Sequence, residues 1–166
     1  MRVVEGTAEI EDITAFVSRL QEIGAETDCT IQAFDSRYVV SDAHLRRAVE
    51  LADRAFERGE NVADDRAVEI LLYVAARRQI NRALAIGANE GECDLVVLVD
   101  AERENGDEQA ASAAVSDLLT EKKTLGHYDE ERVCTFFDIG EAERGASNAS
   151  LEALVLEQVA LLDVSK

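Results

Sequence analysis

Four arginines lie close together in a stretch of the chain that has almost no acidic residues. From residue 66 to residue 88 the sequence holds Arg66, Arg77, Arg78 and Arg82 against one carboxylate, Glu69, so the segment carries a net charge of +3. The other residues total −21, which makes this segment a cationic island in an acidic chain. Guanidinium groups pair with phosphate through two hydrogen bonds and also stack on bases. The island therefore indicates RNA binding.

Two arrangements of the island follow from its spacing. In the first, a helix over 77–87 begins near Arg77, points backbone N–H groups at the bound phosphate and directs Ile80, Ala83 and Leu84 inward. In the second, Arg78 and Arg82 lie one helical turn apart on an exposed face and pair with neighbouring carboxylates. The first arrangement is a binding site and the second is ordinary surface structure, and the spacing alone is compatible with both.

No arrangement typical of catalysis is found in the sequence. None of the nine glycines belongs to a cluster that could hold a phosphate, and there is no G-x-S-x-G elbow for a serine nucleophile. His44, in the first turn of an expected helix, and His127, in a polar turn, are interpreted as surface histidines. No two cysteines or histidines fall within one helical turn of each other, so no metal site is predicted. We therefore expect no enzyme and no cofactor.

The acidic surface is the strongest feature of the composition. The sequence has 35 aspartates and glutamates against 17 lysines and arginines, a net charge of −18. In ~1 M salt the Debye length is ~3 Å, so repulsion between exposed carboxylates is largely screened. We therefore expect a salt-loving source. In such salt the net charge does not exclude an RNA partner, because long-range repulsion is muted.

The length of 166 residues is typical of one domain, and neither a repeat nor a proline-rich linker divides the chain. We expect a single domain over residues 1–166. Because no apolar run reaches the ~18 residues of a membrane span and the first residues lack the pattern of a secretory signal, we expect no membrane contact and a cytoplasmic location. Cys29, Cys93 and Cys134 are widely spaced and are interpreted as buried, reduced thiols.

Strands and helices alternate irregularly along the sequence. Residues 93–99 form a nearly continuous β-branched run, typical of a central strand that is covered on both sides. Strands separated by unequal numbers of helices favour an α+β fold, with a small mixed or antiparallel sheet packed with several helices. The other expected strands are 3–4, 29–34 and 133–137, and the expected helices are 8–24, 42–59, 68–76, 77–87, 110–119 and 150–164. Either Asp64 or Asp65 is expected to cap the helix at 68–76.

The cationic segment also carries a family motif. Residues 69–87, EILLYVAARRQINRALAIG, resemble the signature E-I-L-x-Y-x-S-G-x-R-Q-I of the PRPK-binding or TPRKB family, the small subunit of the KEOPS complex. The hydrophobic run at 93–100 and a closing helix at 156–164 extend the resemblance over most of the chain. With its acidic composition, the chain resembles a halophilic archaeal member. The matching positions are Glu69, Ile70, Leu71, Tyr73, Arg78, Gln79 and Ile80.

The resemblance implies a noncatalytic, regulatory subunit with two partners. In that family the small subunit docks on the complex's atypical, PRPK-like protein kinase and captures the 3′ CCA end of tRNA. It thereby supports the modification of the adenosine 3′ of the anticodon to threonylcarbamoyladenosine. Other KEOPS subunits are contacted only indirectly, and the chain when alone can form a homodimer. For tRNA we expect Arg77, Arg78, Gln79, Asn81 and Arg82, with Arg78 and Gln79 favoured because the motif contains them.

For the kinase we expect apolar positions that the closing helix leaves exposed, namely Leu154, Val155 and Leu162. The alternative is that these residues form a buried stripe over the protein's own core, and Ile80 likewise is either a core residue or a base contact. Two functions of another kind stay open. One is a self-associating structural protein whose C-terminal helix pairs with its copy, and the other is a small-ligand regulatory domain without RNA binding.

One departure from the family signature lies between the two central helices. Ala75 and Ala76 stand where the family has a small residue and a glycine. Glycine gives easy access to positive φ. Either the break between the helices is milder in this chain, or the backbone there never needs positive φ.

Overall fold

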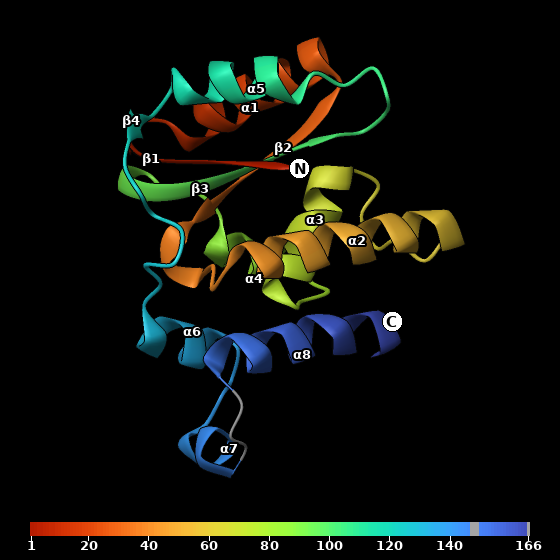
Figure 1. Cartoon of the computed structure of the whole chain (residues 1–166), viewed down its shortest axis with the longest axis vertical. Coiled ribbons are helices and arrows are strands. Elements are labelled where there is room, and N and C mark those ends of the chain that lie inside the picture. Colours follow the sequence, from red (N-terminus) through yellow and green to blue (C-terminus); the bar gives the residue numbers. More distant parts are fainter. Residues whose placement is uncertain (147–149, 166) are drawn as a thin grey trace. The chain divides into compact units, whose positions relative to one another are not determined.

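The structure is a computed structural model that describes residues 1–146 and 150–165. The chain forms two compact units, the first from Met1–Ser36 and Gly87–Leu125 and the second from Arg37–Ile86 and Gly126–Lys166. A four-stranded antiparallel sheet is combined with helices in the described residues (Figure 1), so the expected α+β class is confirmed. The expectation of a single domain stays a prediction.

An antiparallel sheet with two covering helices makes up the first unit. Its elements are β1 (Arg2–Ile10), α1 (Ile13–Thr27), β2 (Cys29–Asp35), β3 (Gly91–Ala101), α5 (Glu108–Ser116) and β4 (Thr120–Glu121). The strand order is β2-β3-β1-β4, so β3 lies between the two other long strands and the predicted central strand is confirmed. Both α1 and α5 lie on one face of the sheet (Figure 1), where their apolar residues share a core with alternate residues of β3.

The helix α1 begins and ends later than the sequence indicated. Ile10 still belongs to β1, and the Asp12 carboxylate accepts hydrogen bonds from two backbone N–H groups in the first turn of the helix. The helix then continues past Gly24 to Thr27. A Cβ atom on Gly24 would lie 2.6 Å from the carbonyl oxygen of Cys29, so this glycine allows close packing inside the unit. The predicted start at residue 8 and stop at Gly24 are therefore wrong.

The second unit is helical, and several of its boundaries follow the sequence signals. Its elements are η1 (Ser36–Tyr38), α2 (Asp42–Arg58), α3 (Arg66–Ala75), α4 (Ile80–Ala83), η2 (Leu84–Ile86), α6 (Glu130–Phe136), α7 (Glu141–Ala146) and α8 (Leu151–Ser165). Ser41 caps α2 and Gly59 ends it at φ 70°, as predicted. Of the two aspartates expected as the cap of α3, Asp64 and Asp65, the structure has Asp65. The helices α2, α3 and α8 pack on one another. The position of α3 thus depends on contacts with both of these longer helices.

The strand expected at 133–137 is a helix, α6, and the prediction was wrong. The Asp129 carboxylate accepts a hydrogen bond from the Arg132 N–H and so caps the helix. Val133 and Phe137 lie four positions apart on one face and are 0% and 1% exposed. The β-branched and aromatic run is therefore the buried face of a short helix, because i and i+4 share a helical face.

His44 is a core residue, so its interpretation as a surface histidine was wrong. Its side chain is fully buried, Nδ1 accepts a hydrogen bond from the Val40 N–H at 3.3 Å, and Nε2 donates to the Val74 oxygen at 2.8 Å. Burial lowers the pKa of His44 to about 4, so the ring is neutral and fits one donor and one acceptor. His127 lies in an exposed turn, as expected.

The three cysteines are free thiols. Cys29 and Cys93 are buried, and Cys134 is partly buried. Burial raises the pKa of the Cys29 thiol, which keeps it protonated. None of the helices in the described part of the chain is long and apolar enough to cross a membrane.

Candidate functional site

The expected RNA-binding residues lie on the turn after α3 and on the short helix α4. The helix α3 ends because Ala76 adopts the left-handed conformation, with φ 52° and ψ 43°. The Ala76 N–H donates to the Tyr73 oxygen and the Arg77 N–H to the Leu72 oxygen, each at 3.0 Å, which is the Schellman pattern of helix ends. The turn therefore uses positive φ although alanine stands there, and both alternatives offered for the missing glycine are wrong.

The helix expected over 77–87 is limited to the four residues of α4. The reason is the cap itself: it uses the Arg77 N–H, and the chain turns away before it becomes helical again after Gln79. The first predicted arrangement, with a helix beginning near Arg77, was therefore wrong. The Arg77 N–H is therefore not available to a phosphate at this turn.

Arg77 is largely enclosed by the end of α6 and the residues that follow it. Its Nη2 donates a hydrogen bond to the Phe136 carbonyl oxygen, and its guanidinium carbon lies 4.8 Å from the centre of the Phe136 ring. Asp138 Oδ2 lies 3.7 Å from Nη2, and the Arg77 side chain is 17% exposed. This arginine is therefore committed to contacts within the second unit.

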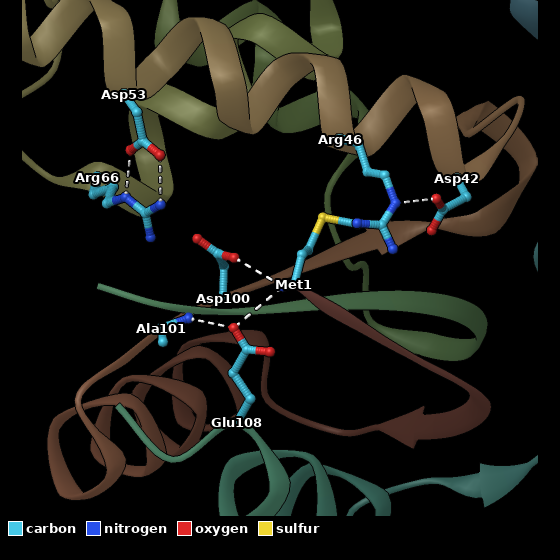
Figure 2. Close-up of polar contacts among 8 residues, drawn as sticks. All are labelled: Met1, Asp42, Arg46, Asp53, Arg66, Asp100, Ala101 and Glu108. Carbon is cyan, nitrogen blue, oxygen red and sulfur yellow. Dashed lines mark hydrogen bonds and ion pairs between the residues drawn. The ribbon is translucent and has the colours of Figure 1, made fainter. Parts of the chain in front are cut away.

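Arg66, at the start of α3, is also committed to an internal contact. Its Nε and Nη2 donate to the two carboxylate oxygens of Asp53 at 2.8 Å and 3.0 Å, a bidentate pair that joins α3 to α2 (Figure 2). The Arg66 side chain is 17% exposed. Two of the four arginines in the cationic island thus serve the fold of this unit.

The other predicted tRNA-binding residues are exposed and close together in the chain. Within the described residues, the side chains of Arg78, Gln79, Asn81 and Arg82 make no hydrogen bond or ion pair. The second predicted arrangement, in which Arg78 and Arg82 pair with carboxylates, is thus not found in that part of the chain. The sequence has no carboxylate between Glu69 and Glu90, and the Glu69 carboxylate is buried, where it accepts hydrogen bonds from two backbone N–H groups. Local charge at this turn is therefore positive.

Two apolar side chains accompany these arginines on the surface. Ile80 is 44% exposed and Leu84 is 56% exposed, so their predicted inward orientation was wrong. Ala83 is buried, as predicted, and Ile86 is buried as well. Periodicity did not separate these two sides, because a four-residue helix is too short to define a face.

The three residues chosen for the kinase are not exposed. Leu154 is 4%, Val155 0% and Leu162 7% exposed. Leu154 and Val155 belong to a core cluster with Val133 and Phe137 of the α6 region. The predicted exposure was therefore wrong, and the alternative of a buried stripe describes these positions.

Sequence reasoning missed the apolar residues that α8 does expose. Leu161 is 54% and Val164 is 81% exposed, and both line a groove of about 450 Å³ with Ala76, Gln158 and the edge of Leu162. The sequence did carry a signal for them: the apolar face of this helix is wider than one stripe, so it holds more apolar residues than its buried side needs. Residues 161 and 164 are the apolar positions that remain exposed.

The fold and these surfaces define an α+β protein that presents an arginine-bearing turn and an apolar helix edge. Its described residues contain no group of three or more histidine, cysteine or acidic side chains that could hold a metal ion. The chain matches the family model of the kinase binding protein CGI-121 over residues 7–163, so it belongs to this family and the predicted family is confirmed. That description supports a kinase partner. No curated protein matches the chain.

Proposed function

We propose that this protein is a noncatalytic subunit of the KEOPS complex of a halophilic archaeon. It binds the complex's atypical protein kinase and captures the 3′ CCA end of tRNA, in support of the threonylcarbamoyl modification of the adenosine 3′ of the anticodon. Membership in the kinase-binding family supports the first partner. The observation that carries the second is the turn on which Arg78 and Arg82 have no ion-pair partner among the described residues.

The chemistry of this turn suits an unpaired RNA end. Residues 76–85 include no aromatic side chain, so bases stack on the guanidinium planes of Arg78 and Arg82. Base stacking contributes roughly 1–3 kcal/mol per base and is available only where bases are unpaired. The amides of Gln79 and Asn81 can donate and accept, as base edges require. Stacking also persists in concentrated salt, where phosphate pairing is weakened.

The kinase docks on the exposed edge of α8, at Leu161 and Val164. A large apolar side chain that is half exposed or more gains free energy when a partner covers it, by about 25 cal/mol for each Å² of apolar area. The groove beside these residues provides a concave surface for a partner side chain. This surface replaces the buried positions first chosen on the same helix.

The tRNA role is tested by affinity for intact tRNA and for the same tRNA without its CCA end. Arg78→Glu should weaken binding to intact tRNA tenfold or more, on the order of the energy of one arginine contact. The matched control is Arg58→Glu, because Arg58 is an exposed arginine at the end of α2, away from the turn in sequence. Equal affinity of the unmutated protein for the two tRNAs would refute the capture of the CCA end.

The kinase role is tested by mass measurement of the protein mixed with its kinase. A stable one-to-one complex is expected, and Leu161→Glu with Val164→Glu should abolish it. Val17→Glu is the control, since Val17 is an exposed valine on α1 of the first unit. A homodimer that persists in the presence of the kinase, and that the double variant dissolves, would instead favour the self-associating structural protein.

A further inference from the structure

We infer that Arg77 is a positioning residue, which holds the turn that presents Arg78 and Gln79 and does not itself bind RNA. The inference rests on the proposed tRNA-binding function of this turn. Arg77 and Arg78 are neighbours in the sequence, yet one side chain is 17% exposed and bonded within the unit, whereas the other is exposed.

The groups of Arg77 that could bind RNA are its guanidinium plane, its N–H donors and its positive charge, and each of them already has a contact within the unit. The guanidinium carbon lies over the Phe136 ring, 4.8 Å from its centre, so the ring fills space that a stacked base would need. Nη2 donates to the Phe136 oxygen, and Asp138 at 3.7 Å offsets the positive charge. A cation over an aromatic ring is attracted by the electron-rich face of the ring, and the attraction is stronger where water is excluded. A phosphate would have to compete with all three contacts.

The group that anchors Arg77 is itself well held. The Phe136 ring makes edge contacts with the rings of Tyr38 and Phe137, at centre distances of 5.6 Å and 5.1 Å. The Phe137 carbonyl oxygen accepts a hydrogen bond from Gln158 Nε2 of α8 at 2.6 Å. We call the contacts of Arg77 with Phe136 and Asp138 the clamp. The clamp joins the turn after α3 to a packed aromatic group at the end of α6.

The main chain of Arg77 is fixed at the same place. Its N–H completes the Schellman cap of α3, so backbone and side chain are both tied before the chain reaches Arg78. Without the guanidinium, the cap still directs the chain, but the turn loses its attachment to the α6 segment. RNA affinity should therefore depend on Arg77 through geometry and on Arg78 through direct contact, in which its plane stacks on a base and its charge pairs with phosphate.

Salt dependence separates these two effects. For single strands, each phosphate neutralised adds about 0.7 to the slope of log affinity against log salt. Affinity for intact tRNA is measured in a potassium chloride series over which circular dichroism shows the folded chain. The variants are Arg77→Gln, Arg77→Lys, Arg78→Gln and Arg78→Lys. Lysine keeps the charge but has neither the planar group nor the fork of donors of arginine.

The expected results differ for the two neighbours. Both Arg77 variants should lower affinity about tenfold while the salt slope stays that of the unmutated protein, so lysine does not rescue. Arg78→Gln should lower both affinity and slope, the latter by about 0.7, and Arg78→Lys should keep the slope. If Arg77→Gln reduces the slope as Arg78→Gln does and Arg77→Lys restores it, Arg77 binds phosphate and the inference is overturned.

Hydrogen exchange without RNA supplies a readout that does not depend on the proposed function. The amides of Arg82 and Ala83 donate to the Gln79 oxygen, so they report on the geometry of the turn. They should exchange faster in both Arg77 variants than in the Arg78 variants, while amides of α2 stay protected. Unchanged exchange at these two amides would overturn the positioning role, whatever the protein binds. Failure of the unmutated protein to bind tRNA, combined with the expected exchange, would refute the proposed function and leave the clamp in place.

Discussion

Replacing Ala76 by glycine should stabilise the protein. Ala76 caps α3 at φ 52° and ψ 43°. In this conformation the Cβ of an L-residue crowds the backbone, at roughly 1–2 kcal/mol. Glycine removes that strain, but it also gives the unfolded chain more freedom, which costs about 0.4–1 kcal/mol. The difference is a gain of roughly 0.5–1 kcal/mol in the free energy of unfolding, or about 1–4 °C in Tm for a chain of this size.

Ala75 offers a matched control one position earlier. It is the last residue of α3 and is 0% exposed. Glycine at a helical position is less favourable than alanine by roughly 0.5–1 kcal/mol, and the lost methyl group leaves a small gap in the core. Ala75→Gly should therefore destabilise the protein by about 1–2 kcal/mol. The two alanines respond in opposite directions because their φ angles have opposite signs.

Urea unfolding followed by far-ultraviolet circular dichroism measures both variants, at one fixed salt concentration. The salt has to be the same throughout, because the stability of so acidic a chain depends on screening. If Ala76→Gly lowers the free energy of unfolding as Ala75→Gly does, Ala76 is not left-handed. The Schellman cap, and with it the direction of the turn that carries Arg78, would then be refuted.

Three further predictions concern the interior of the two units. Stability should fall as the pH is lowered from 6.5 to about 4, because folding lowers the pKa of His44 to about 4 and the unfolded chain binds the extra proton in this window. In urea titrations His44→Gln should flatten this pH dependence and His127→Gln should not. Gly24→Ala should cost about 1–3 kcal/mol, because its Cβ would lie 2.6 Å from a carbonyl oxygen, whereas Gly140→Ala, with nothing within 4 Å, should be neutral by the same assay. Arg66→Gln should lower the free energy of unfolding by up to about 1 kcal/mol and leave the affinity for tRNA unchanged in binding titrations.

The elements that could be predicted are those whose ends are marked by the sequence itself. Ser41 and Gly59 bracket α2, and Asp65 starts α3, because a capping side chain or a residue at positive φ acts within one turn of its own position. The strand β3 was recognised because a run of β-branched residues buried on both faces has no polar positions. Local interactions decided these elements, so local patterns were sufficient.

The errors arose where contacts distant in sequence decide the outcome. Nothing near His44 indicates that the Val74 oxygen will face its ring, so a histidine in a first helical turn is predicted to be exposed. Val133 and Phe137 fit a strand by composition, and only the packing of α6 shows that they share a helical face. Leu154 and Val155 are apolar residues at helical spacing, and this pattern is the same for a docking surface and for a buried core. Only their burial shows that they belong to the core.

The charge count identified residues 66–88 as a cationic segment. The structure divides the four arginines of this segment into two that make contacts inside the unit and two that are exposed. Arg66 and Arg77 join helices of the second unit, and Arg78 and Arg82 face solvent without an ion-pair partner among the residues described. A net charge of +3 therefore overstates the charge available to a partner, because a guanidinium paired with a carboxylate contributes little to the field outside. The difference depends on which side chains find a carboxylate or a ring after folding.

Ala76 connects the two proposed surfaces. As the cap of α3 it sets the direction of the turn toward Arg78, and its side chain also lines the groove beside Leu161 and Val164. The arginine turn and the apolar edge of α8 thus meet within the second unit. Because one residue serves both, a change at Ala76 cannot assign a binding defect to either partner. Substitutions at Arg78 and at Leu161, each of which belongs to one surface alone, are the ones that separate tRNA binding from kinase binding.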